Sequence, residues 1–277
     1  AGAHARAETE AAAGSAAERG APDPAAERSA LDAAAEREAP PALLALCAAA
    51  TGFTFLLMEL VFYRMLSPLL GGSSFTFGLI LATALMGIGL GGLAYPVLSA
   101  RMPPTLGRFA LCCALQAVSL AAPYALGDRV ALLAASLRAL RGFHGQVLGW
   151  VVICQIVILP AALLSGLQFP LLLALSGRGA RRLGRQIGAC YGWNTAGAIA
   201  GSLGGGFGLL PALSAPGTWR LAAVLLAALA ALRALAEGRG APRRLRVVLP
   251  PLLLGALALG LLRAEGPSAA WRHSGIG

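Results

Sequence analysis

The chain has 277 residues, of which 57% are hydrophobic and only 12% are charged, a composition that excludes an ordinary water-soluble domain. Every one of the 22 basic residues is an arginine, and the formal net charge is +10. No basic stretch is interleaved with aromatic residues, so nucleic-acid binding is not expected. We instead expect the arginines to contact anionic lipid headgroups at a membrane.

Residues 1–40 form an Ala/Glu/Arg-rich tail with almost no large apolar side chain. Such a segment cannot bury enough surface to fold alone, which predicts disorder. The tail does not begin with Met and lacks the pattern of a signal peptide, so we expect residue 1 not to be the natural start of a gene product.

The apolar segment at residues 41–66 predicts the first membrane span, because 26 helical residues reach about 39 Å and a hydrocarbon core is roughly 30 Å thick. Glu59 interrupts this span and Arg64 follows five positions later, which places the two on different helix faces. A carboxylate in hydrocarbon is costly. Glu59 is therefore either a functional group or half of an ion pair between helices.

A turn is predicted at residues 67–74, with Ser73 or Ser74 capping the helix that follows. The second span covers residues 75–98, where Gly87 and Gly91 continue a row of small residues suited to close helix packing. The glycines at 87, 89 and 92 also match a dinucleotide-binding fingerprint, but they lie inside an apolar helix, so this match carries no function.

The third span is predicted at residues 109–126, followed by an interfacial amphipathic helix at 127–146 that carries three arginines. Residues 147–176 predict the fourth span, which contains Gln155 and Gln168. Its prolines at 160 and 170 predict a kinked or interrupted helix, because proline removes a backbone donor.

The fifth span, residues 188–213, is uncharged and rich in glycine. Gly197, Gly201 and Gly205 form one row at four-residue spacing. A second row of small residues consists of Gly188, Gly192, Ala196, Ala200, Gly204 and Gly208. Because small residues allow a close approach of backbones in lipid, the two rows predict two close neighbours and place this helix at the packing centre of the bundle.

Ahead of this span, four arginines at 178, 181, 182 and 185 are spaced to share one helix face. We expect Arg178, Arg181, Arg182 and Arg185 to meet phosphate headgroups or an acidic partner. A sixth span is predicted at residues 219–236 and a seventh at 247–262. Fifteen of the 22 arginines then fall on one side, which predicts a cytoplasmic amino terminus.

The five cysteines lie in apolar segments without a CxxC pattern, and the three histidines are isolated. These patterns predict no metal site, no cofactor and no catalytic residues in the chain. The sequence therefore predicts an all-α fold: a tail at 1–40, a polytopic transmembrane helix bundle of about seven spans at 41–263, and a linker at 264–277. The oligomeric state is left open.

Several motifs, in order along residues 42–213, carry a family resemblance. They are Glu59 with Arg64, the run Leu70–Ser74, the SGLQFP run at 165–170, and Tyr191, Asn194, Thr195, Gly197 and Gly201 followed by GGFGLLP at 205–211. Together they resemble the membrane region of spermidine-synthase-like multi-span membrane proteins of bacteria. The YxxNTxG run is the most specific part.

The resemblance implies a place in the bacterial inner membrane and a soluble aminopropyltransferase-like domain after residue 277. The chain itself lacks that domain, so any aminopropyl transfer would need it. We expect a scaffold that positions a soluble domain or partner subunit. The alternative is a transporter-like half in which Glu59, Arg64, Gln168, Tyr191, Asn194 and Thr195 form a polar site for a small solute.

Overall fold

A computed structural model gives the structure of the protein. It describes residues 40–101, 103–138, 142–176, 183–237, 245–269 and 271, and no strand occurs within these ranges. The predicted tail therefore lies almost wholly outside the described residues. The helices belong to one unit, Ala39–Gly277.

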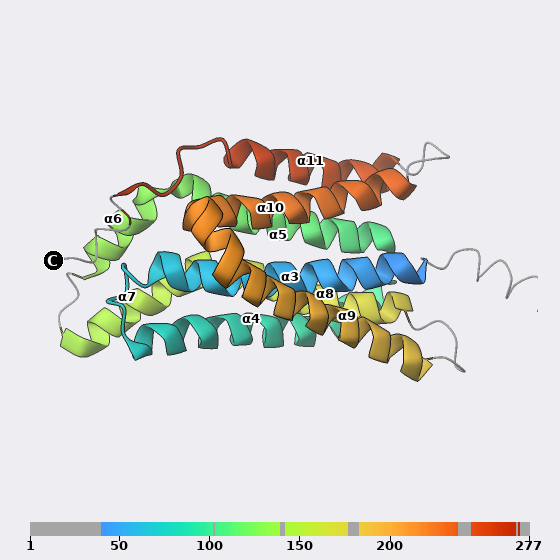
Figure 1. Ribbon diagram of the computed structural model, residues 1–277, viewed down its shortest axis with the longest axis horizontal. Coiled ribbons are helices and arrows are strands. Elements are labelled where there is room, and N and C mark those ends of the chain that lie inside the picture. The colour runs from blue at the N-terminus through green and yellow to red at the C-terminus, as the bar shows by residue number, and fades with distance from the viewer. Residues whose placement is uncertain are drawn as a thin grey trace, which may run out of the picture. The chain divides into compact units, whose positions relative to one another are not determined.

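The described chain folds into consecutive helices joined by short connections (Figure 1). In chain order these are α3 (Pro41–Leu66), α4 (Ser74–Arg101), α5 (Leu106–Leu126), α6 (Asp128–Leu137), α7 (Gly142–Val157), α8 (Leu159–Ser176), α9 (Leu183–Gly204), the π-helical turn η1 (Gly205–Leu209), α10 (Leu210–Glu237) and α11 (Leu245–Leu261).

Five of the described helical segments are long and apolar enough to cross a bilayer. They are Pro41–Leu66, Ser74–Arg101, Leu106–Leu126, Leu159–Ser176 and Gly184–Leu232. Large apolar side chains are exposed on these segments, as lipid-facing surfaces require. The predicted all-α class is thus confirmed for the described residues, and the five apolar segments indicate a membrane-embedded protein. The predicted number of seven crossings is not confirmed, because α7 and the apolar part of α11 are shorter than a full span.

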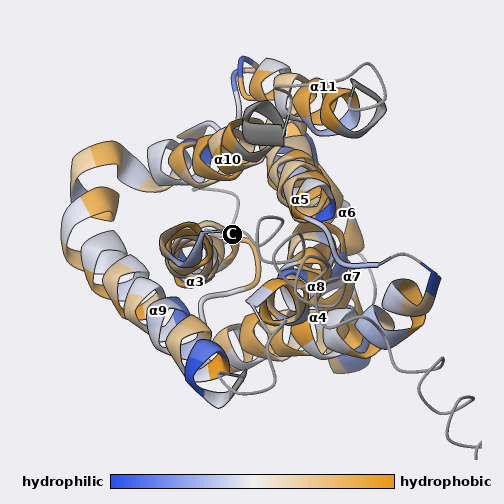
Figure 2. Cartoon of the chain, turned by 90° about the vertical axis from the view of Figure 1, so that its right-hand side faces the viewer, coloured by the Kyte–Doolittle hydropathy of each residue, from blue (hydrophilic) through white to orange (hydrophobic). Residues whose placement is uncertain are grey.

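Helix α3 occupies the centre of the bundle and is surrounded by α9, α10, α5 and α8 (Figure 2). It buries large side chains completely, among them Leu57, Val61 and Leu66. Helix α9 instead runs along one side of α3 and leaves its outer face open. The prediction that the glycine-rich helix is the packing centre is wrong. Glycines permit close approach on one face, but they have no side chains with which to fill a core.

One small-residue row of α9 does pack as predicted. A Cβ added at Gly197 would overlap the carbonyl of Ala49, and one added at Gly201 would overlap the carbonyl of Phe53. Gly205 lies against the side chain of Leu57. Because both sets of positions increase by four in the same direction, α3 and α9 run parallel at this contact, as Figure 1 also shows.

The second row of α9 has no neighbour. A Cβ added at Gly188, Gly192, Gly204 or Gly208 would meet no atom within 4 Å in the described structure. The prediction of two close neighbours is therefore wrong for the chain by itself. Only the row that begins at Gly197 is covered, because α3 is the helix that α9 crosses closely.

Helices α4 and α8 make the second close crossing, and here the predicted row is confirmed. A Cβ at Gly87 would overlap Ala162, and one at Gly91 would overlap the backbone of Leu163. Gly166 of α8 approaches α4 equally closely. The fingerprint-like glycines lie within α4, so their rejection as a nucleotide site is consistent with the structure.

The chain breaks close to where its prolines and glycines predict. Helix α7 ends at Val157 and α8 begins at Leu159, just before Pro160. Helix α10 bends at Ser214, whose φ is +63°, two residues before Pro216. The predicted interfacial helix is shorter than expected, since α6 ends at Leu137 and α7 already begins at Gly142.

The turn between α3 and α4 forms as predicted. Gly71 and Gly72 adopt φ values of +86° and +64°, which favour glycine. The Ser73 hydroxyl accepts a hydrogen bond from the backbone N–H of Thr76 at 3.4 Å and so caps α4.

Candidate functional site

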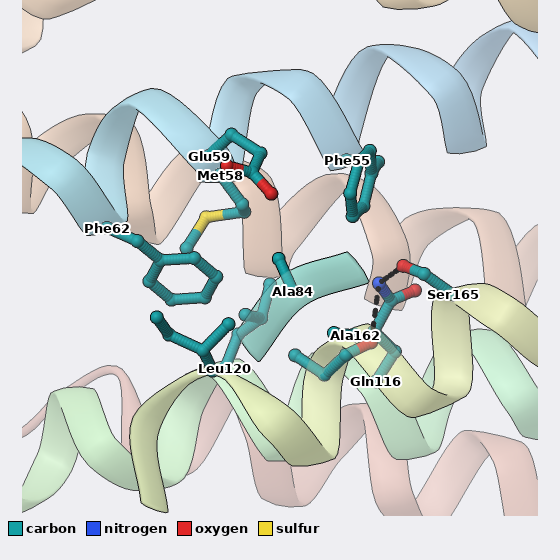
Figure 3. A pocket seen from close by; sticks show the side chains of 11 residues that line it. Phe55, Met58, Glu59, Phe62, Ala84, Gln116, Leu120, Ala162 and Ser165 are labelled. Carbon is teal, nitrogen blue, oxygen red and sulfur yellow. Dashed lines mark hydrogen bonds between the residues drawn. The ribbon is translucent and has the colours of Figure 1, made fainter. Parts of the chain in front are cut away.

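Glu59 lies on α3 and faces a pocket between α3, α4, α5 and α8 (Figure 3). Its Oε1 atom is buried and has no hydrogen-bond partner in the described structure. No described residue forms an ion pair with Glu59, and Arg64 is exposed at the end of α3. The interpretation of Glu59 as half of an inter-helix ion pair therefore has no support within the described residues.

The pocket is mainly apolar. Its side-chain walls include Phe55, Met58, Phe62, Ala84, Leu120 and Ala162, and its other polar residues are Gln116 and Ser165. In Figure 3 Glu59 reaches the pocket from α3, whereas Gln116 and Ser165 lie across it. The free space accommodates roughly one water molecule. This site can hold a very small polar species, but not a large solute.

A buried amide pair forms the polar side of this region. Gln168, which is 2% exposed, donates from Nε2 to the Oε1 of Gln116 at 2.6 Å. Gln116 in turn donates from Nε2 to the Ser165 hydroxyl at 2.6 Å and to the carbonyl of Ala161 at 3.4 Å. The pair cross-links α5 and α8 with satisfied hydrogen bonds, which is how polar side chains hold helices together in lipid.

Gln116 and Ser165 were not among the predicted site residues. A signal for them exists in the sequence, since Gln116 is a lone amide in an apolar span and Ser165 precedes Gln168 by three residues, on one helix face. Only the pairing of α5 with α8 could not be deduced from the sequence. The structure joins Gln168 to the Glu59 pocket through Gln116.

Asn194 lies elsewhere, at the crossing of α3 and α9. Its side-chain Nδ2 donates to the carbonyl of Ala48 at 3.1 Å, and its backbone carbonyl lies against Gly52. Tyr191 and Thr195 are exposed, although the Tyr191 ring packs edge-on against Phe169 at 4.6 Å. The six predicted polar-site residues therefore do not converge on one pocket.

The predicted headgroup-binding arginines are only partly described. Arg185 is exposed near the start of α9, as expected for a lipid contact. Arg178, Arg181 and Arg182 lie outside the described residues.

An aromatic cluster holds the carboxyl-terminal segment against the bundle. Trp219 and Trp271 are fully buried, with ring centroids 6.4 Å apart in an edge-on arrangement. Trp271 Nε1 donates to the carbonyl of Met65 at 2.6 Å, which is among the last carbonyls of α3 that lack an intrahelical partner. Trp219 donates to the carbonyl of Leu120 at 3.0 Å. The part of the predicted linker that contains Trp271 thus packs on the helices.

Ser268 makes a second attachment beside this cluster. Its backbone N–H and its hydroxyl both donate to the carboxylate of Asp128, at the start of α6. The hydrogen bond from the Ser268 hydroxyl is the main cause that lowers the pKa of Asp128 below its usual value of 3.8.

We expect this attachment to weaken in acid. Because the folded pKa of Asp128 is lowered, its stabilising contribution is present above the usual value of 3.8 and is lost as the pH falls through the folded value. The contribution should be below about 1 kcal/mol, since the carboxylate is largely solvated. Thermal unfolding of wild type and Ser268→Ala in nanodiscs should differ at neutral pH and converge in strong acid. A difference that persists in acid would show that the pair does not act through the Asp128 charge.

Within the described residues, no three His, Cys, Asp or Glu side chains gather where they could hold a metal ion. Comparison with protein-family models, curated proteins and solved structures returns no match for the chain. The geometry therefore defines a membrane-embedded helical bundle with one small carboxylate-containing pocket and one open helix face.

Proposed function

We propose that this chain is the membrane-embedded anchoring module of a spermidine-synthase-like protein in the bacterial inner membrane, where it positions a soluble domain or partner subunit. The observation that carries the proposal is the open face of α9. Small residues repeat every four positions along Gly188, Gly192, Ala196, Ala200 and Gly204 of α9 and Gly208 of η1. No described atom lies within 4 Å of a Cβ added at any of the four glycines.

The two rows of α9 provide an internal comparison. The row at Gly197 and Gly201 shows what this kind of surface does when a helix is available, because α3 approaches it until the backbones touch. The open row has the same spacing on another face of the same helix. Small residues in lipid favour helix association by close van der Waals packing. A transmembrane helix of a partner subunit is therefore the occupant that fits this face.

The anchored carboxyl-terminal segment supports the positioning role. Trp271 and Ser268 attach the end of the described chain to α3 and α6. A domain that follows Gly277 would then be joined, through residues 272–277, to a segment that is attached to the bundle at Trp271.

The proposed module crosses the membrane seven times with a cytoplasmic amino terminus. The apolar segment Gly184–Leu232 has 49 residues, about 74 Å of helix, whereas one crossing needs roughly 30 Å. The bend at Ser214 divides it, and α10 turns back beyond that bend in Figure 1. Two crossings from this segment, together with α11, complete the proposed count.

The transporter-like alternative has less support. A solute path needs its polar residues on one accessible cavity. Gln168 is instead paired with Gln116, and Asn194 is bound to the carbonyl of Ala48, eleven positions before Glu59 on α3. Glu59 alone of these three predicted residues lines the pocket.

The test compares leucine substitutions at glycines that all face open space. We expect Gly204→Leu and Gly192→Leu to leave the bundle folded but to release the partner, because leucine would hold a second backbone away. The control is Gly78→Leu on α4, a glycine that also has no atom within 4 Å of an added Cβ. The particle size of the protein, extracted in nanodiscs from native membranes, is the measurement.

Wild type and Gly78→Leu should run as a complex larger than one chain, and the two α9 variants should run smaller. The partner-subunit form of the proposal fails if wild type is already a single chain in native membranes. It also fails if the α9 variants keep the full-sized complex.

A further inference from the structure

The carboxylate of Glu59 poses a charge problem that the described residues do not solve. Oε1 is buried without a hydrogen-bond donor, and no described cation pairs with it. A lone carboxylate inside a membrane bundle is costly, and such groups are neutralised or paired in functioning proteins. Something other than the described side chains must balance this charge.

The size of the pocket limits what that species is. The free space beside Glu59 holds roughly one water molecule, and the surrounding rings and aliphatic chains are packed. An organic cation would not fit. Metal cations need several oxygen ligands, six to eight in the case of calcium, and this mainly apolar lining does not supply them.

The polar wall opposite Glu59 has one group with unused capacity. The Gln116 amide is occupied on both sides, since its oxygen accepts from Gln168 and its nitrogen donates to Ser165 and Ala161. The Ser165 hydroxyl accepts one of these bonds and keeps its own proton and a second lone pair. It can therefore orient one small guest across the pocket from the carboxylate.

No other charged side chain of the described residues lines the pocket. Of the charged residues described on α3, α4 and α5, Arg64, Arg101 and Arg108 lie near helix ends and do not line the pocket. The described part of α8 has none. The buried thiols of Cys112 and Cys113 on α5 also lie outside the lining.

We propose that the Glu59 pocket is a proton-binding site, in which the carboxylate takes up one proton from water and is neutral at neutral pH. The proposal is independent of the scaffold role, because it rests on the pocket between α3, α4, α5 and α8 and not on the open face of α9.

Infrared difference spectroscopy of the full chain in nanodiscs tests the proposal. Spectra at neutral and alkaline pH are compared. At neutral pH, where solvated carboxylates are ionised, wild type should show a protonated-carboxyl band. This band should disappear at alkaline pH and should be absent from Glu59→Gln.

Two further variants keep the test decisive. Asp128→Asn removes a solvated carboxylate outside the pocket and should leave the band unchanged. Glu59→Asp keeps a carboxyl group in the same pocket and should shift the band rather than abolish it, which assigns the signal even if Glu59→Gln folds poorly. The absence at neutral pH of any protonated-carboxyl band that responds to Glu59 substitution would overturn the proposal.

Discussion

Gly201→Leu should prevent the bundle from assembling. A Cβ at this position would overlap the carbonyl oxygen, the carbonyl carbon and the Cα atom of Phe53, all of which belong to the backbone of α3. A flexible side chain could move aside, but the backbone of the central helix cannot do so without moving its other neighbours. We expect a loss of about 3 kcal/mol or more, the upper end of overpacking effects. Unfolding in a detergent titration would measure it.

Gly204→Leu is the matched control for this experiment, because it places the same side chain three residues away on the open face of α9. It should change the unfolding midpoint of the single chain little. Equal destabilisation by both substitutions would indicate that leucine is harmful anywhere on α9. An unchanged Gly201→Leu protein would contradict the close α3–α9 contact.

The features that were predicted correctly from the sequence depend on interactions within one helix or one turn. Helix α3 was predicted with its observed bounds, because a continuous apolar run and a proline at its first residue are local signals. The break at Pro160 and the glycine turn before α4 are also local. The packing row at Gly87 and Gly91 was recognised because its spacing is a property of one helix.

The predictions that are wrong or incomplete concern which helices pack against each other. The sequence shows two small-residue rows on α9 but not that a single neighbour, α3, is available within the chain. It shows Gln168 but not that Gln116 lies opposite it, 52 residues earlier in the chain. The sequence also leaves two interpretations of Glu59 open, a functional group or half of an ion pair. The choice depends on whether a cationic side chain of another helix lies next to Glu59.

The attachment of Trp271 is a further case of a distant partner. The family resemblance places Trp271 in a linker that leads to a soluble domain. Its indole reaches a carbonyl of α3 206 residues earlier in the chain. Only the three-dimensional arrangement of α3, α10 and α11 creates the buried place that this ring fills.

Trp219→Ala should be the most damaging substitution in the aromatic cluster. Trp219 is fully buried and touches the rings of Phe62, Tyr124 and Trp271 edge-on, so its removal leaves a cavity where three elements meet. Its loss also removes the donor to the carbonyl of Leu120. In a soluble core such a change costs about 3–5 kcal/mol.

The lower end of that range applies here. Lipid is as apolar as a protein core, so the transfer of the indole from solvent contributes little, and the cavity and lost van der Waals contacts supply most of the effect. We therefore expect about 3 kcal/mol in the same detergent titration. Trp219→Phe serves as the control: it keeps an aromatic ring, loses the hydrogen bond and part of the indole's volume, and should cost less, about 1–2 kcal/mol. Equal losses for the two variants would assign the effect to the hydrogen bond rather than to packing. If Trp219→Ala also frees the carboxyl-terminal segment, proteolysis after Arg263 should accelerate, because Trp271 packs directly against the removed ring.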